Sequence, residues 1–487
     1  MKHISDIKKM ERCDKMLWLS KHEPQHFQPF IYYNEDINEL TRKRLNITHW
    51  FEGKTGDEND VFFQQEKEYD FFFHTRFEYH DLRIRIPLME KRKSGYRIYF
   101  TYAACYPKES DAQLIADHIW VLQQLNISIE KVRLIHLNSE YIRKEQLDVE
   151  ELLIINDFFY NEKNHRAEKV MTLIEKKIRD LDPLLKQVDE ILSQEEMIKK
   201  RTNICTRKHK CPYFERCFHT PNKDTSILNL VSSSRKFALL EEGISDMKDV
   251  DMEQIEGTRH QYAQLYAAKT GTMFFDRGAV HNCLVANVEY PISYLDFEWE
   301  TYAYPPYPEM KPFDVLTFQY SLHIETNHGA ELIHKEYLGM QDCRKAFIEH
   351  LLNDIPKEGS VICYNVEGAE KLRLKQLAKQ FPEYEAALKS IWERMIDLSI
   401  PFANGLIYDN RMAGMYSLKK LVAIFTDYDY ADLDISHGME AVRNYRLLDE
   451  ESASAKQETL QELLAYCAMD TYAMVLIYHW ILQQLSQ

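Results

Sequence analysis

The pattern of apolar and polar positions changes twice along the chain. In the first 150 residues, aromatic and β-branched residues dominate three segments that predict strands: VFFQQEKEYDFFFHTRFEYHDLRIRIPLME, GYRIYFTYAACY and KVRLIHLN. Between the last two, DAQLIADHIWVLQQLN has apolar residues at helical spacing. Residues 151–200 are heavily charged and predict helices. From residue 290, three strand-like segments precede several helices, the last from about 457 to 484. This alternation predicts a mixed α/β fold.

Composition and charge narrow the class of protein. The 487 residues are 45% apolar and 28% charged, as in an ordinary globular protein of two to three domains. The net charge of −16 disfavours a protein that coats nucleic acid by bulk charge. A compact site in which metal ions meet phosphates remains compatible with it. The sequence shows no apolar run typical of a signal peptide or a membrane span, so we expect a cytoplasmic protein without a membrane partner.

Two acids stand two residues apart in the strand-like segment YPISYLDFEWE. Side chains alternate along a strand, so Asp296 and Glu298 are expected on one face and Leu295 and Phe297 on the other. Two carboxylates placed in this way can both reach one divalent cation. A solvent-exposed pair of acids is the alternative interpretation.

Further polar residues lie on later elements. Tyr466 and Asp470 are four residues apart in the last predicted helix and therefore share a helical face. The apolar residues around them indicate a buried helix, where an Asp requires a partner such as a metal ion. A Tyr–Asp pair near the helix surface is the alternative. Asn365 and Glu370 stand where a strand turns into a helix, and an acid at a helix start is also favoured by the helix dipole alone.

Three of the nine cysteines cluster in CTRKHKCPYFERCF. Without a secretory signal, reduced thiols or metal ligands are expected rather than disulfides. Cys205, Cys211 and Cys217 can hold an iron–sulfur cluster or zinc, or they are three buried thiols in an aromatic-rich loop. The candidates for a fourth ligand are His209, His219 and Cys13.

Basic residues surround this cysteine cluster. They can contact a phosphate backbone, or they can balance the acidic helix that precedes them. The basic patch consists of Lys199, Lys200, Arg201, Arg207, Lys208 and Lys210.

The order of the acidic motifs resembles that of the DEDD exonucleases of the ribonuclease-H-like fold, in the subgroup with a tyrosine. In that family four acids hold two metal ions, here Mg²⁺ or Mn²⁺. The resemblance implies that Asp296 and Glu298 form the first motif, Glu370 the second, and Tyr466 with Asp470 the third. It also implies cleavage from 3′ to 5′, with the tyrosine orienting the attacking water.

The second motif departs from the family pattern. The family has an Asp four residues after the Asn, whereas this chain has Ala369 there and Glu370 one place later. Asp397 is a further candidate for the missing ligand or for a residue behind it. We expect Asn365 to contact nucleic acid, together with Arg207, Lys208 and Lys210 of the basic patch.

The chain as a whole resembles a bacterial family known as domain of unknown function 2779. The segments that carry this resemblance are YLDFEWET, FQYSLHI, AEKLRLKQLA, MYSLKKLV and YCAMDTYAM, with CDKMLWLSKHEP and KVRLIHLNSEYIRKEQLD in the N-terminal half.

The N-terminal half resembles the PD-(D/E)XK nucleases whose ends are joined by an iron–sulfur cluster. One Cys precedes their nuclease core and three follow it, which implies a 4Fe–4S cluster, or alternatively zinc, on Cys13, Cys205, Cys211 and Cys217. The strand RIYFTYAAC lacks the acid-x-Lys of active enzymes, and Arg85 stands where their Asp is expected. We therefore expect an inactive nuclease fold that serves as a scaffold or binds nucleic acid.

These observations predict three domains. Residues 1–225 form the degenerate PD-(D/E)XK-like domain with the cysteine cluster, 226–288 a helical connector, and 289–487 a ribonuclease-H-like DEDD exonuclease domain. The expected function is two-metal-dependent 3′ to 5′ exonuclease activity on DNA or RNA. The alternatives are a non-catalytic nucleic-acid-binding protein, and an N-terminal active site that recruits Asp81 or Glu90.

Overall fold

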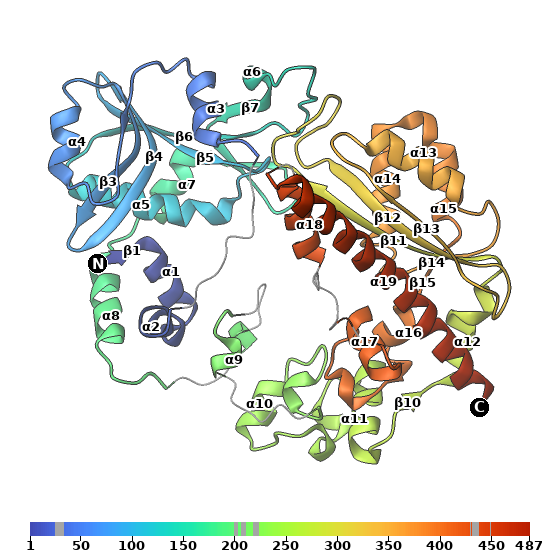
Figure 1. Cartoon of the computed structure of the whole chain (residues 1–487). Coiled ribbons are helices and arrows are strands. Elements are labelled where there is room, and N and C mark those ends of the chain that lie inside the picture. The colour runs from blue at the N-terminus through green and yellow to red at the C-terminus, as the bar shows by residue number, and fades with distance from the viewer. Residues whose placement is uncertain are drawn as a thin grey trace. The chain divides into compact units, whose positions relative to one another are not determined.

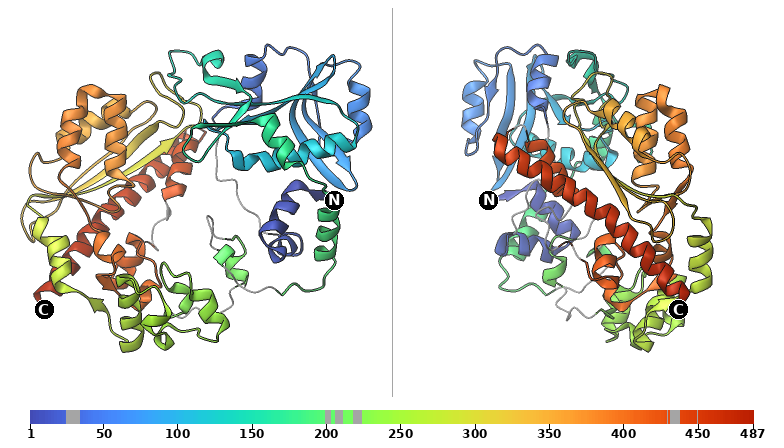
Figure 2. Two further views of the ribbon diagram at one scale, coloured as in Figure 1. Left: turned by 180° about the vertical axis from the view of Figure 1, so that it is seen from behind. Right: turned by 45° about the vertical axis from the view of Figure 1, so that its right-hand side comes forward.

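The computed structural model of the chain describes residues 1–24, 34–198, 203–205, 211–217, 224–428, 430, 438–448 and 450–487. Contacts within the chain divide it into two compact units. Unit 1 is Met1–Cys217 with Tyr302–Asp314, and unit 2 is Phe218–Thr301 with Val315–Gln487. Each unit has its own sheet and apolar core, so the mixed α/β class predicted from the sequence is confirmed (Figures 1 and 2).

Unit 1 is built on a seven-stranded sheet in the order β2-β3-β4-β5-β6-β7, with β1 beside β4. Strands β3, β4 and β5 form an antiparallel meander. Strand β6 runs parallel to β5 and is reached through helix α5, as a parallel connection requires. The strands are β1 Lys2–His3, β2 Phe51–Glu52, β3 Phe71–Tyr79, β4 Leu82–Arg92, β5 Gly95–Tyr102, β6 Ile129–Leu137 and β7 Leu153–Asn156.

Helices and a second, two-stranded sheet complete unit 1. The α-helices are α1 Ile4–Arg12, α2 Asp14–His22, α3 Ile37–Arg44, α4 Asn59–Gln65, α5 Ala112–Gln124, α6 Val149–Leu152, α7 Val170–Lys177, α8 Asp182–Leu192 and α9 Phe214–Cys217. The small sheet pairs β8 Phe158–Tyr160 with β9 Arg166–Lys169.

Two local predictions in unit 1 were wrong. Residues 153–169 were expected to be helical, but they contribute β7, β8 and β9. The apolar run from Leu153 pairs with the edge of the sheet at β6, and β8 and β9 pair with each other. The segment VFFQQ was expected to be a strand and lies in α4. Its Phe62 is fully buried against Phe72 and Phe77, so one apolar helical face satisfies these aromatic residues as well as a strand would.

Unit 2 is built on a five-stranded sheet in the order β13-β12-β11-β14-β15. Strands β11, β12 and β13 form an antiparallel meander, and β14 and β15 run parallel to β11. The strands are β11 Ile292–Thr301, β12 Val315–Glu325, β13 Ile333–Leu338, β14 Val361–Cys363 and β15 Met395–Asp397, with a separate pair β10 Phe274–Phe275 and β16 Ile407–Tyr408. The three strand segments predicted after residue 290 are confirmed as β11, β12 and β14.

Alternation along β11 sets the two faces of this sheet. Leu295 and Phe297 pack into the core that also contains Phe347 of α13 and Leu374 of α14. Ile292 and Tyr294 point to the other face of the sheet and belong to the core beneath α17 and α19. The α-helices are α10 Lys236–Glu241, α11 Arg259–Thr270, α12 Arg277–Cys283, α13 Arg344–Asp354, α14 Glu370–Gln380, α15 Glu385–Trp392, α16 Ile400–Ala403, α17 Leu418–Phe425, α18 Gly438–Leu447 and α19 Ala453–Ser486.

Helix α19, dark red in Figure 1, is the longest element of unit 2, with 34 residues. It begins at the cap Ser452, whose side chain accepts a hydrogen bond from the backbone of Ala455. Its length and composition would also allow it to cross a membrane, but the core helix of a folded domain meets the same two criteria. Within unit 2 it packs across β11 and β12 (Figure 2).

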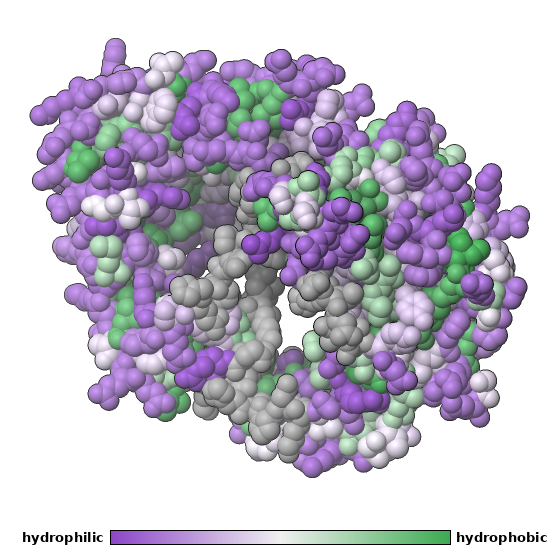
Figure 3. Space-filling view, in the orientation of Figure 1, coloured by the Kyte–Doolittle hydropathy of each residue, from purple (hydrophilic) through white to green (hydrophobic). Residues whose placement is uncertain are grey.

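The described surface carries its exposed apolar side chains among hydrophilic residues. Hydrophilic residues cover most of the face seen in Figure 3. Exposed apolar residues such as Ile198, Met415 and Tyr428 are of the kind that ordinary protein surfaces carry.

Candidate metal centre

Three carboxylates from two elements meet on the α19 face of the unit 2 sheet. Asp296 and Glu298 project from β11, and Asp470 projects from α19. Each acid offers one carboxylate oxygen to the group, and these three oxygens all lie within 4.8 Å of one another. The two strand acids share a face, as the alternation of the segment predicts, and the packing of α19 brings the third acid to them. Such a group of oxygen ligands suits Mg²⁺ or Mn²⁺.

Glu370 lies beside this group. It is the first residue of α14, its side chain is buried, and its Oε2 atom has no hydrogen-bond partner. Burial raises the pKa of its carboxyl well above the ordinary value, and the negative charge of Asp296 raises it further. Ala369 is the N-cap residue of α14 and has no carboxylate to offer. Glu370 is therefore the acid of the second motif that lies near Asp296.

Asp397 is engaged elsewhere. One of its carboxylate oxygens accepts hydrogen bonds from the backbone N–H groups of Asn365 and Ser399, and the other accepts one from Val366. These bonds hold the turn between β14 and α14, in which Asn365 has a left-handed φ of 64°. The side chain of Asn365 is next to Gly368, where an added Cβ would lie 2.9 Å from the Asn amide nitrogen. Asp397 and Asn365 thus shape the turn that positions Glu370.

The acids of this group stand close together and are largely withdrawn from solvent, with Asp296 the most accessible of them. Burial raises the pKa of Asp296 and of Glu298 well above the ordinary values, and repulsion from the neighbouring carboxylates adds to both shifts. Burial also raises the pKa of Asp470, although the charge of Lys419 and a hydrogen bond from Tyr430 oppose the shift. Buried carboxylates in this state either keep protons or bind a cation. The donor set and the unpartnered oxygen of Glu370 therefore fit divalent metal ions.

Tyr466 stands on the same face of α19 as Asp470, one turn earlier. Lys419 of α17 donates a hydrogen bond of 2.9 Å to its hydroxyl, and the ammonium lies 4.4 Å from the centre of its ring. Burial raises the pKa of Tyr466, and the nearby carboxylates raise it further, so the hydroxyl keeps its proton. Tyr430 donates a hydrogen bond of 2.7 Å to Oδ1 of Asp470.

Lys419 and Tyr430 are residues that the sequence analysis missed. A signal for Lys419 was present in MYSLKKLV, because the lysine stands three residues before Val422, which is fully buried, and so borders the apolar face of the helix. Burial lowers the pKa of Lys419, and the charges of Asp470, Glu298 and Asp296 oppose that shift. A lysine in this position commonly extends its ammonium to solvent, so only the structure shows that it lies beside the acids. Tyr430 gave no comparable signal.

The raised carboxyl pKa values predict how stability depends on pH. Above about pH 4, the unfolded chain releases protons that the folded acids retain, so the contribution of this site to the free energy of unfolding falls as pH rises toward the folded pKa values. A divalent cation replaces those protons. We expect Mn²⁺ to raise Tm more at about pH 8 than at about pH 5, as measured by thermal unfolding. An equal shift at both pH values would contradict this prediction.

The four cysteines named from the sequence share one neighbourhood in unit 1. Cys13 lies between α1 and α2, Cys217 ends α9, and the backbone N–H of Cys211 donates a hydrogen bond of 2.7 Å to the carbonyl of Cys205. Burial raises the pKa of Cys211 and of Cys217, and the charges of Cys13 and Cys205 contribute to both shifts. Arg207, Lys208 and Lys210 lie outside the described residues, as do Lys199, Lys200, Arg201, His209 and His219.

A tetrahedral zinc site and an iron–sulfur cluster both take four thiolate ligands. The shared neighbourhood of Cys13, Cys205, Cys211 and Cys217 is therefore compatible with either kind of metal site.

The N-terminal acids Asp81 and Glu90 are paired with cations. Asp81 lies 3.2 Å from the N-terminal ammonium and 3.5 Å from Nζ of Lys2. Glu90 accepts a hydrogen bond of 2.8 Å from the hydroxyl of Tyr99 and lies 3.3 Å from Arg97. These contacts give both acids a structural role.

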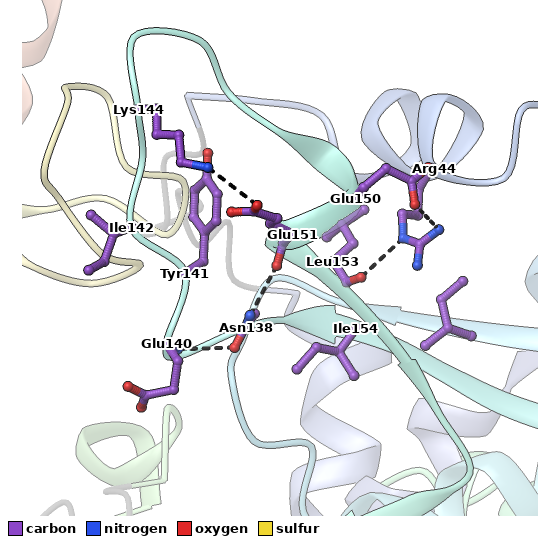
Figure 4. A pocket seen from close by; sticks show the side chains of 11 residues that line it. Arg44, Asn138, Glu140, Tyr141, Ile142, Lys144, Glu150, Glu151, Leu153 and Ile154 are labelled. Carbon is purple, nitrogen blue, oxygen red and sulfur yellow. Dashed lines mark hydrogen bonds and ion pairs between the residues drawn. The ribbon is translucent and has the colours of Figure 1, made fainter.

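An open pocket of about 640 Å³ lies in unit 1 and is shown in Figure 4. Arg44 pairs with Glu150 and donates a hydrogen bond to the carbonyl of Leu153, and Lys144 lies 3.4 Å from Glu151 (Figure 4). Because these charges neutralise one another, the pocket presents no group of reactive side chains comparable to the acids of unit 2.

Comparison with known proteins identifies one segment of the chain. Residues 293–417 match the family model of a domain of unknown function, DUF2779, which supports the family predicted from the sequence. The matched segment includes Asp296, Glu298 and Glu370 and ends before Tyr466 and Asp470. No curated protein and no solved structure matches the chain.

Proposed function

We propose that unit 2 is a divalent-metal-dependent exonuclease that hydrolyses phosphodiester bonds of DNA or RNA from the 3′ end. The observation that carries the proposal is the meeting of Asp296, Glu298 and Asp470 within 4.8 Å, with the buried carboxylate of Glu370 beside them. The sheet order β13-β12-β11-β14-β15 is compatible with the ribonuclease-H-like fold that the order of motifs implies. The 3′ to 5′ polarity comes from that resemblance.

Each side chain of the site has a distinct task under this proposal. Asp296, Glu298 and Asp470 would hold one metal ion, and Asp296 with Glu370 would hold a second. Bound there, the two ions would supply an activated water and stabilise the leaving oxygen. Tyr466 keeps its proton and orients the attacking water through its hydroxyl.

Lys419 acts through the tyrosine. Its ammonium donates to the phenolic oxygen of Tyr466, so the Tyr466 proton points away from Lys419, and the hydroxyl also hydrogen-bonds to Asp470. The same positive charge offsets part of the repulsion among the acids. Lys419 is therefore a positioning residue, and it also tunes the charge of the metal centre.

The test is an assay of the purified full chain with end-labelled single- and double-stranded DNA and RNA. With Mg²⁺ or Mn²⁺ we expect stepwise shortening from the 3′ end, which stops when a chelator removes the ions. Tight binding of these substrates without any shortening would contradict the exonuclease and support the non-catalytic nucleic-acid-binding protein. The paired acids of unit 1 are consistent with a scaffold role for that unit in either case.

Unit 1 is proposed to hold a 4Fe–4S cluster on Cys13, Cys205, Cys211 and Cys217, supported by the shared neighbourhood of these thiols and by the resemblance that the order of the cysteines carries. Protein purified without oxygen is expected to be brown, with broad visible absorbance and about four iron atoms per chain. A colourless preparation in which these thiols hold zinc would favour the zinc alternative. The control is Cys283→Ser, a change at a thiol in unit 2, which should leave the colour and the iron content unchanged.

A further inference from the structure

A second group of metal-ligating side chains lies at another place in unit 2. Glu325 ends β12, His328 follows in the turn toward β13, and His479 lies in the last part of α19. One ligand atom of each lies within 4.8 Å of the others. Nε2 of His479 is 2.9 Å from Oε2 of Glu325, and the two imidazole rings are 5.8 Å apart between centroids.

The carboxylate of Glu325 is held in place from behind. The side chain is fully buried, the hydroxyl of Tyr294 donates to Oε2 over 3.2 Å, and the backbone N–H of Gly329 donates to Oε1 over 2.8 Å. Donors that fix a carboxylate in this way are typical of the residues that surround a metal ligand. The ring of His328 packs edge-on against that of His479, so both imidazoles approach this carboxylate.

The ligand chemistry selects the kind of ion. Two imidazoles with one carboxylate suit zinc and similar transition metals, whereas Mg²⁺ and Ca²⁺ prefer oxygen ligands alone. We propose that Glu325, His328 and His479 bind a single transition-metal ion of the zinc type. His328 is exposed, so water can complete the coordination from the solvent side.

This site is separate from the acidic centre. Ile292 pairs with Glu325 across the sheet and Asp296 pairs with Ser321, four residues further along each strand, which is about 13 Å. His479 follows Asp470 by nine residues on α19, also about 13 Å. A metal ion here would tie the β12–β13 turn to α19, the helix that carries Tyr466 and Asp470. Metal binding by Glu325, His328 and His479 uses none of the residues of the proposed nuclease site.

The test measures zinc bound to the full chain in excess Mg²⁺, which occupies carboxylate sites but competes poorly for imidazole. His328→Ala is the main variant, because an exposed side chain can be removed without disturbing the core. His479→Ala is the second variant. Each is expected to bind one zinc ion fewer per chain than the wild type, or to bind that ion about 10- to 100-fold more weakly. The rise of Tm caused by zinc should shrink in both.

The matched control is His281→Ala, which removes an exposed histidine of α12 and should leave zinc binding unchanged. With Co²⁺, the difference spectrum between the wild type and His328→Ala should show visible d–d bands without a sulfur charge-transfer band, which separates this site from the cysteines. Equal zinc content and equal zinc affinity in the wild type and His328→Ala would overturn the proposal.

Discussion

Asp296→Asn and Asp470→Asn are each expected to abolish metal-dependent shortening of end-labelled nucleic acid. Both acids belong to the group whose oxygens meet within 4.8 Å, and an amide cannot supply the charge that holds a divalent cation. We expect the rate to fall at least about 10³-fold, a loss of about 4 kcal/mol of transition-state stabilisation. The measurement is the single-turnover rate of shortening at saturating Mn²⁺.

The same variants are expected to gain stability in the absence of metal. Burial raises the carboxyl pKa values of Asp296 and Asp470, and the charge of Asp470 raises that of Asp296 further, so replacing one acid by an uncharged amide relieves an unfavourable charge. We expect Tm of the metal-free protein to rise by about 2–4 °C, with a loss of the further rise that Mn²⁺ causes in the wild type. Opposite effects on activity and stability separate a functional acid from one that only supports the fold.

Two further variants make this comparison sharper. Glu336→Gln removes an exposed acid of β13 in the same sheet and should change neither activity nor the response to Mn²⁺. Glu370→Gln should lower the rate by a smaller factor, about 10- to 100-fold, because Glu370 faces the group mainly through Asp296. Full activity in Asp296→Asn and Asp470→Asn would rule out the proposed metal centre.

Tyr466→Phe is expected to lower the rate about 10²-fold while leaving the affinity for Mn²⁺ almost unchanged. The hydroxyl keeps its proton and is oriented by Lys419, so its loss removes the group that positions the attacking water and no metal ligand. Single-turnover rates over a range of Mn²⁺ concentrations separate the two quantities. Tyr472→Phe, six residues further along α19, serves as the control and should be fully active.

Lys419→Met is expected to lower the rate of shortening and, unlike Tyr466→Phe, to raise the affinity for Mn²⁺. The change removes the hydrogen bond to Tyr466 and should lower the rate, but it also removes a positive charge beside three acids. Mn²⁺ should therefore bind more tightly to the variant than to the wild type. Lys420→Met, at the adjacent position of α17, is the matched control.

A Tyr466→Phe variant with an unchanged rate of shortening would remove the tyrosine from the proposed mechanism.

The sequence by itself determined the local geometry of the acidic motifs. Strand alternation placed Asp296 and Glu298 on one face, and helical spacing placed Tyr466 and Asp470 on one face. Both periods are properties of the backbone, so they can be read without knowledge of what packs against the element. The main strands of unit 2 and the long last helix follow from the same periods. Residues 153–169 were predicted to be helical, but pairing with β6 holds residues 153–156 in a strand, and residues 158–169 pair with one another as β8 and β9.

Only the tertiary structure decided which of these faces meet. The position of α14 selected Glu370 over Ala369 and Asp397, and the packing of α17 against α19 brought Lys419 to Tyr466. The group of Glu325, His328 and His479 likewise joins a strand end to a distant helix. Such contacts depend on which elements pack across the sheet, and local periodicity carries no information about that choice.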